Sequence, residues 1–153
     1  MRVSAKADYA VRAAIELAAS ADAEHPLKGE AIGAAQGIPL PFLQNILAEL
    51  RHAGIVHSKR GADGGHWLTR PADEITIADV IRAVDGPLAN VRGAPAEELT
   101  YQGAAEPLQS VWLALRANVR EVLESVSLAD LVDRDLPQPV LRLSEDPDVR
   151  GAR

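Results

Sequence analysis

Cysteine is absent from this chain of 153 residues, and aromatic residues make up only 3% of it. Without cysteine the chain forms no disulfide, offers no thiolate to a metal and has no thiol nucleophile. With so few aromatic rings, the core must consist of alanine, leucine, valine and isoleucine, which suits packed helices. Apolar residues still account for 47% of the chain, enough for a folded core.

Long apolar runs are missing too. No stretch approaches the roughly 18 consecutive apolar residues of a transmembrane helix, and the N-terminus lacks a signal-peptide pattern. We therefore expect a cytoplasmic protein. No nucleophile–base constellation is apparent, and Gly64-Gly65 is not followed by a helix, so it does not fit a phosphate-binding loop. We expect no enzymatic activity.

The net charge of −6 argues at first against nucleic acid as a partner, but its distribution is uneven. Residues 1–70 contain eight Lys and Arg against seven Asp and Glu, whereas residues 71–153 contain eight against fifteen. Any DNA-binding surface should therefore lie in the first half, with a local positive potential and modest non-specific affinity.

The stretch from Ala31 to Arg70 has the most informative pattern. A short helix should end at Gln36, because Gly37 adopts the positive φ of a helix C-terminus at little cost. Pro39 and Pro41 lack an N–H and fit only the first turn of a following helix. The apolar residues of that second helix recur at spacings of three and four: Phe42, Leu43, Ile46, Leu47 and Leu50.

A hairpin follows this second helix, which Gly54 ends. Ile55-Val56 and His66–Leu68 are short strand candidates, and residues 59–65 between them have the composition of a loop. The order predicts a winged helix-turn-helix, whose second helix fits the DNA major groove. Many helical hairpins bind nothing, and the basic hairpin alone is better explained as solvated surface. The complete order of elements favours DNA binding.

Two more helices should surround this unit. Ser4 is a candidate N-cap for the first helix. Near the start of that helix, Lys6 and Tyr9 could both donate to DNA phosphates; the alternative is that Lys6 is solvated and Tyr9 is part of the core. Thr76 and Asp79 form a capping box for the second, which should pack against the first.

A long helix is predicted from Glu106, with Pro107 in its first turn. Its apolar stripe favours a homodimer interface over the alternative, an intrachain core helix. The predicted interface residues are Leu108, Val111, Trp112, Leu115, Val119, Val122 and Leu123. A capping box at Ser127 starts a short last helix, and prolines and charges then predict a flexible tail. The expected divisions are residues 1–87, the winged helix-turn-helix; 88–105, an irregular loop; 106–132, the dimerisation and last helices; and 133–153, the tail.

Three stretches carry a resemblance to a known family: the opening MRVSAKADYAVRAAIELA, the run LRHAGIVHSKRGADGG and the late LADL. In these stretches the chain resembles the BadM/Rrf2 family of winged helix-turn-helix regulators, of the IscR, NsrR and CymR type. The likeness extends from Met1 to about Val132. It implies a mostly α fold with a small two-stranded β-wing and a long C-terminal dimerisation helix. It also implies a homodimeric transcription factor, usually a repressor, on a partly palindromic operator.

The resemblance carries over DNA contacts by position. On the recognition helix they are Pro39, Pro41, Gln44 and Asn45. In the wing they are Ser58, Lys59, Arg60, Gly64 and Gly65, with Arg60 in the minor groove. The N-terminal backbone contacts are Arg2, Ser4, Lys6 and Tyr9. Gln and Asn suit adenine in the major groove, and Arg suits a narrow minor groove. The two prolines replace hydroxyl residues that often start this helix.

The sensor region departs from the family pattern. Cluster-binding members place three cysteines there, and this chain has none. Gln109 occupies the position of a ligand histidine in some members, and Asp8 alone cannot hold a cluster. The histidines His25, His52, His57 and His66 show no metal-binding spacing; His52 and His57 could approach each other around Gly54, but two histidines without further ligands make a poor metal site. We expect no iron–sulfur cluster, metal or other cofactor.

The leading hypothesis is a dimeric DNA-binding repressor controlled by a small molecule or a partner protein. Candidate effector contacts are the loop from Asn90 to Gln102 and the helix start near Gln109, in the cleft between the winged-helix body and the dimer helix. The rival is a protein-interaction module that docks on an enzyme or another regulator through its acidic half. The sequence does not specify the operator, the regulated genes or the effector.

Overall fold

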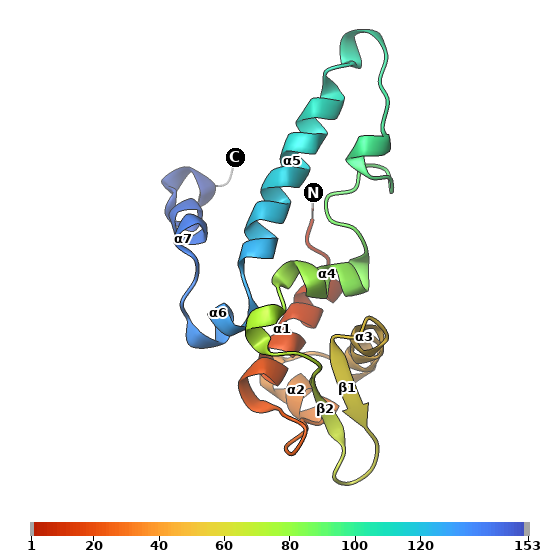
Figure 1. The fold of residues 1–153 in the computed structure, drawn as a ribbon, viewed down its shortest axis with the longest axis vertical. Coiled ribbons are helices and arrows are strands. Elements are labelled where there is room, and N and C mark those ends of the chain that lie inside the picture. The colour runs from red at the N-terminus through yellow and green to blue at the C-terminus, as the bar shows by residue number, and fades with distance from the viewer. Residues whose placement is uncertain (1, 152–153) are drawn as a thin grey trace.

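Helices dominate the computed structural model, which describes residues 2–151 and contains one small β-sheet there (Figure 1). The mostly α class with a two-stranded wing and a long late helix is as predicted. The helices and strands are α1 (Ala5–Ser20), α2 (Gly29–Gln36), α3 (Leu40–His52), β1 (Val56–Lys59), β2 (Gly65–Leu68), α4 (Ile77–Asp85), α5 (Leu108–Ser125), α6 (Leu128–Asp133) and α7 (Gln138–Glu145). Short 3-10 turns lie at Ala72–Glu74, Ala96–Glu98, Gly103–Ala105 and Pro147–Val149.

Helices α2 and α3 form the predicted helix-turn-helix. Gly37 ends α2 with a φ of 63°, and its N–H donates to the Gly33 carbonyl. Pro39 caps α3 and Pro41 lies in its first turn, where a missing N–H removes no intrahelical hydrogen bond. The buried face of α3 consists of Leu43, Ile46, Leu47 and Leu50. The recognition helix is therefore held by its apolar face, and its other face is exposed.

Phe42 does not belong to that buried face. The sequence groups it with Leu43 and Ile46, yet 63% of its surface is exposed. It lies in the first turn of α3, beside an open hollow between α1 and α3 that Tyr9 and Ile46 also line. Phe42 shares the apolar spacing of α3 but not its buried face, because the first turn of α3 lies at the edge of the core.

The wing is a two-stranded antiparallel hairpin, β1 with β2. The first strand, expected at Ile55-Val56, begins at Val56 and continues to Lys59. A further bridge attaches the wing to the segment before α2. The Leu27 N–H donates to the His66 carbonyl at 2.9 Å, and the His66 N–H donates back at 2.8 Å. The wing is thereby fixed to the body on its β2 side.

The core is centred on α1, which packs against α2, α3, α4 and α6. Its buried residues are Ala7, Ala10, Ala13, Ala14 and Leu17. Such small side chains allow neighbouring helices to approach closely. The predicted caps are confirmed: Ser4 accepts from the Ala7 N–H, and Thr76 and Asp79 form a capping box. The expected packing of α4 on α1 is confirmed as well.

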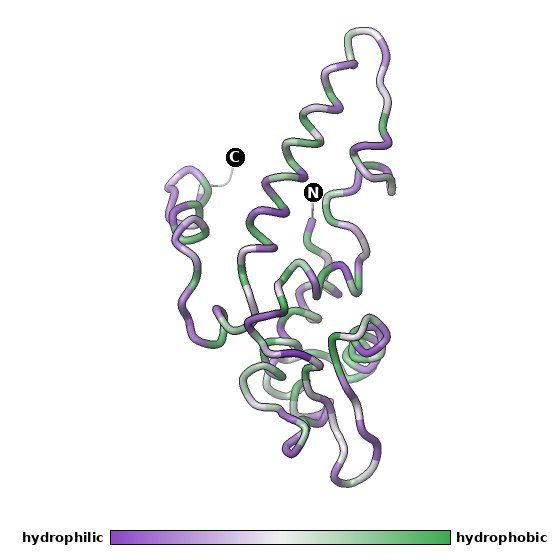
Figure 2. Tube along the Cα trace, in the orientation of Figure 1, coloured by the Kyte–Doolittle hydropathy of each residue, from purple (hydrophilic) through white to green (hydrophobic). Residues whose placement is uncertain are grey.

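Helix α5 extends from this core as a long arm (Figure 1), and hydrophobic segments mark it along its length (Figure 2). None of its residues is buried in the described chain. Val119 and Leu123, near its base, pack against the core, whereas Val111 is 55% exposed. The predicted stripe is thus partly intrachain at the base and uncovered further out. No helix among residues 2–151 is long and apolar enough to cross a membrane.

Helix α6 begins at the predicted capping box of Ser127. Backbone hydrogen bonds from Ile77 to Val126 (3.0 Å) and from Leu128 to Ile75 (2.9 Å) join the starts of α4 and α6.

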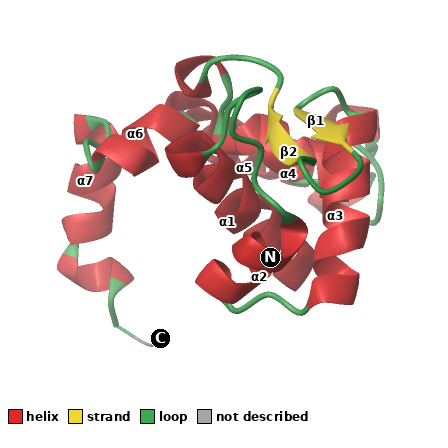
Figure 3. Ribbon diagram, turned by 90° about the horizontal axis from the view of Figure 1, so that it is seen from below, coloured by secondary structure: helices red, strands yellow, loops and turns green. Residues whose placement is uncertain are grey.

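The tail, predicted to be flexible, contains helix α7. Pro137 and Pro139 occupy its N-cap and first turn, where proline starts a helix rather than interrupting one, so the prolines of the tail did not indicate this helix. Figure 3 shows α6 and α7 on the side of the molecule opposite the strands. The flexibility of the tail stays a prediction.

Candidate DNA-binding surface

An open groove of about 480 Å³ lies between α3, the start of α2 and the wing. Figure 3 shows the strands beside α3 at one edge of the molecule. Four residues predicted to bind DNA line the groove: Gln44, Ser58, Lys59 and Arg60. Folding thus brings the recognition helix and the wing together on one surface. A helix with a neighbouring hairpin matches a major groove and the minor groove next to it.

The exposed face of α3 carries the residues predicted to read bases. Pro39, Pro41, Gln44 and Asn45 are all exposed. Within residues 2–151, the amides of Gln44 and Asn45 form no hydrogen bond with protein groups, so they are free to pair with base edges. The two prolines have no donor and offer apolar contact only.

Cations gather where the wing loop begins. Lys59 and Arg60 are exposed, and neither forms an ion pair in the described part of the chain. Lys28 joins them from the start of α2, because its Nζ donates to the Gly61 carbonyl in the loop at 3.3 Å. The local charge is therefore positive despite the acidic chain.

Gly64 and Gly65 shape the wing rather than present a surface. Both are buried. A Cβ on Gly64 would lie 2.1 Å from the Lys59 carbonyl oxygen. A Cβ on Gly65, whose φ is 152°, would lie 2.8 Å from the Leu27 carbonyl. Only glycine permits these approaches, so the structure supports an indirect role for the two residues that were predicted as DNA contacts.

Ser58 and His66 face each other across the strands, with 2.7 Å between Oγ and Nδ1. The hydroxyl predicted to contact DNA is therefore engaged within the wing. Burial lowers the pKa of the His66 imidazole, the positive charge of Arg51 lowers it further, and Glu30 opposes both. The neutral form of His66 is thus favoured.

The N-terminal residues divide into two groups. Lys6 and Tyr9 border the hollow between α1 and α3, which places them near the recognition helix. Tyr9 is half-buried, packs against the core and lies under the Arg12 guanidinium, 4.9 Å from its ring centre. Arg2 and Ser4 instead lie near the end of α4, where the Ser4 hydroxyl donates to Asp85 at 2.5 Å. The structure does not bring this second pair to the groove.

Three exposed side chains near this surface were not predicted to contact DNA: Lys28, Phe42 and Arg51. Arg51 lines the groove two turns after Gln44 on the same face of α3. A spacing of seven residues on a helix would have identified it. Lys28 and Phe42 have no such local signal. Lys28 reaches this surface only because the folded wing lies beside it, and Phe42 is exposed only because it lies at the edge of the core.

The loop in the predicted sensor region runs beside α5 and is fastened to it (Figure 1). Trp112 Nε1 donates to the Tyr101 hydroxyl at 3.0 Å. Gln109 Nε2 donates to the Glu97 carbonyl at 3.4 Å, and Arg116 forms an ion pair with the Glu97 carboxylate. Trp112 is thus partly engaged within its own chain, which the dimer prediction did not anticipate.

Sequence comparisons find this chain similar to known helix-turn-helix transcriptional regulators. A family described as "Rrf2: Iron-dependent Transcriptional regulator" matches residues 3–134. A candidate HTH-type transcriptional regulator of Mycobacterium tuberculosis is 49% identical over 146 residues, which is 95% of this chain and 90% of that protein. The HTH-type transcriptional regulator CymR of Bacillus subtilis is 35% identical over 131 residues, 86% of this chain and 89% of that protein.

Solved structures show the same likeness. The structure of CymR, the global cysteine regulator of B. subtilis, superposes with a TM-score of 0.73 at 32% identity, covering 88% of this chain and 98% of that one. T. potens IscR superposes with a TM-score of 0.68 at 31% identity, covering 100% of this chain and 93% of that one.

The residues of this chain do not fit the iron in that family description. Cysteine is absent, and no cluster of three or more His, Asp and Glu side chains within residues 2–151 is placed to hold a metal ion. Asp8 forms an ion pair with Arg12 at 3.0 Å. The ring of His57 lies 5.6 Å from that of Trp67 across the wing, and Gln109 is bonded to the loop.

Proposed function

The chain belongs to the Rrf2 family of helix-turn-helix transcriptional regulators, and from that membership we propose that it is a homodimeric repressor, acting in the cytoplasm, that binds a partly palindromic operator without an iron–sulfur cluster. The observation that carries the proposal is the groove in which Gln44 of α3 and Arg60 of the wing share one exposed surface.

The chemistry of this groove suits duplex DNA. The amide of Gln44 has the donor and acceptor that pair with adenine in the major groove. The guanidinium of Arg60 suits the negative potential of a narrow minor groove. Lys28, Lys59 and Arg51 add positive charge for the phosphates, against the single carboxylate of Glu30 in the lining.

The exposed apolar stripe of helix α5 supports the proposed homodimer. Val111, which belongs to the apolar stripe of α5, is 55% exposed, and this exposure is unfavourable for a large apolar side chain unless another surface covers it. A second copy supplies the same apolar stripe by symmetry. A two-fold dimer presents two inverted recognition helices, and inverted half-sites are what a palindromic operator offers.

The test starts by selecting bound duplexes from random DNA and measuring their affinity by fluorescence anisotropy over a range of salt concentrations. We expect affinity to fall as salt rises, because bound phosphates release counterions. Arg60→Ala should weaken binding strongly and reduce the salt slope by about one. Arg142→Ala removes the same charge from an exposed position on α7 and should bind as the wild type does.

Two results would contradict the proposal. One is selection that enriches no sequence with salt-dependent affinity, which would favour the rival, a protein-interaction module that uses the acidic half. The other is an equal effect of Arg60→Ala and Arg142→Ala on affinity, which would show that the wing does not contact DNA.

A further inference from the structure

Three arginines line one open pocket of about 450 Å³ between the end of α4 and the middle of α5. Arg82 comes from α4, and Arg116 and Arg120 come from α5 one turn apart. The remaining lining is Gly86, Pro87 and Leu88. This arginine pocket shares no residue with the DNA-binding groove.

Two carboxylates face these three guanidinium groups. Glu124 accepts from Arg82 and from Arg120, the latter at 3.1 Å, and Glu97 pairs with Arg116. One positive charge is therefore in excess. The Glu97 and Glu124 side chains are 54% and 36% exposed, so their three ion pairs with the arginines are solvated and contribute little to stability. An incoming anion can replace these carboxylates without leaving a buried charge alone.

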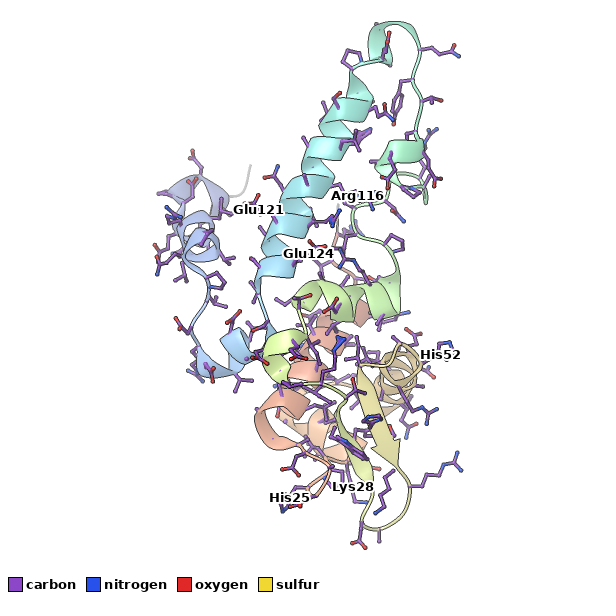
Figure 4. The ribbon with its side chains drawn as sticks, in the orientation of Figure 1. His25, Lys28, His52, Arg116, Glu121 and Glu124 are labelled. Carbon is purple, nitrogen blue, oxygen red and sulfur yellow. The ribbon has the colours of Figure 1, made fainter. Side chains whose placement is uncertain are left out.

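Arg116 has an unused hydrogen-bond donor. Its side chain is 21% exposed, and its Nε is buried without a hydrogen-bond partner in the described part of the chain. A buried N–H in that state is destabilising, so a movement of the Arg116 side chain that gives its Nε an acceptor would be favourable. Figure 4 shows Arg116 and Glu124 on the side of α5 that faces the loop, and Glu121 on the opposite side.

We propose that the arginine pocket binds a small polyvalent anion that carries carboxylate or phosphate groups, and that this anion regulates DNA binding. Planar guanidinium groups bind both kinds of oxyanion through paired N–H donors. The binding part stands on the pocket alone, whereas the regulatory part rests on the proposed function.

The position of the pocket supplies the regulatory link. The Arg82–Glu124 ion pair joins α4 to α5, and an anion on Arg82 competes with Glu124. Asp85, directly before Gly86, is bonded to Ser4 at the start of α1. Occupancy would change the connection between the winged-helix body and the arm, and with it the placement of the recognition helices in a dimer. The anion shifts this equilibrium only if it prefers one arrangement.

Binding is tested first without DNA. Calorimetric titrations at constant ionic strength use inorganic phosphate and citrate as probes, which separate a phosphate ligand from a carboxylate ligand. We expect saturable binding of at least one probe to the wild type. Arg116→Gln and Arg120→Gln should each weaken it about tenfold to a hundredfold, the loss expected for one charge-assisted hydrogen bond. Arg142→Gln, which removes a charge from α7, should leave it unchanged.

Two results would overturn the site. One is no saturable binding of either probe up to about 10 mM, where even a millimolar site would be mostly filled. The other is binding that neither pocket variant weakens. Arg120, half-exposed on the surface of α5, gives a variant that should fold normally if Arg116→Gln does not.

The regulatory part is tested with a selected duplex at matched ionic strength. The probe that binds should change the Kd for DNA in the wild type but not in Arg120→Gln. An unchanged Kd would overturn regulation by this pocket. Anion binding without any DNA binding would overturn the proposed function and leave the site intact, so the two failures are distinguishable.

Discussion

Lys6 at the start of α1 forms an ion pair with Glu49 on the recognition helix, with 3.0 Å between Nζ and Oε2. The lysine predicted to contact phosphate therefore already has a partner on α3, the predicted recognition helix. Both side chains are more than two-fifths exposed, so the pair is solvated and weak. A phosphate would compete with Glu49 for Lys6.

Replacing that carboxylate should strengthen DNA binding. In Glu49→Gln the Lys6 ammonium is free for phosphate and a negative charge near the groove is gone. We expect a gain of about twofold to tenfold in affinity and a steeper salt dependence, by about one phosphate contact. Anisotropy with a selected duplex measures both. Glu145→Gln makes the same charge change at the end of α7, and an equal gain there would show a net-charge effect only.

Gln44 should read one base pair. Gln44→Ala removes the free amide on the exposed face of α3, and we expect a loss of about 1–3 kcal/mol together with a relaxed preference at a single position. Binding to every single-base variant of the operator gives the measurement. A uniform loss across all sequences would mean that Gln44 contacts phosphate.

His66 should titrate below its ordinary pKa of 6.5, because burial and then Arg51 lower it. The unfolded chain then binds more protons than the folded one, so the free energy of unfolding decreases as pH falls from about 6.5 through the lowered pKa. An NMR titration of the imidazole gives the midpoint. Arg51→Gln should raise it only in part, since burial is the larger cause. A wild-type midpoint at or above 6.5 would refute this account.

The exposed part of the arm should form the dimer. Val111→Asp places a charge in the proposed interface, where leaving it unpaired would weaken the dimer by about 3–5 kcal/mol. The fold should survive, because no α5 residue is buried within its own chain as the structure describes it. Light scattering compares it with Ser110→Asp, the neighbouring position off the stripe. A wild type that is monomeric while binding its operator tightly would end the dimer proposal.

Purified protein should contain no iron, and its operator affinity should be equal in air and under anaerobic, reducing conditions. The chain has no thiolate ligands and thiol-based switching is excluded with them. Metal analysis and the visible spectrum give the readout. Stoichiometric iron with a visible absorption band in the protein as isolated would refute the cluster-free prediction.

Local signals predicted much of this structure. The capping boxes at Thr76 and Ser127, and the turn at Gly37, depend on residues within three or four positions, so the sequence pattern identified them directly. The buried face of α3 followed from its spacing in the same way, apart from Phe42 at its edge.

Several side-chain contacts between distant segments were not predicted. The Lys6–Glu49 pair and the bond of Ser58 with His66 engage side chains that a linear pattern treats as free. The arginine pocket joins α4 to α5 across a long loop, and no spacing in the sequence connects them. The helix of the tail was missed because a proline that starts a helix resembles one that prevents it.

The backbone bonds that join the starts of α4 and α6 also fix the base of α5, because they include Val126 directly after that helix. Because α5 is held at this end, a small rotation at its base moves its far end by a much larger distance. With 18 residues, α5 is about 27 Å long at 1.5 Å per residue, so a tilt of about 5° at the base displaces its far end by about 2 Å. In the proposed dimer, a displacement too small to disturb the core would thereby be enough to alter how the two protomers meet.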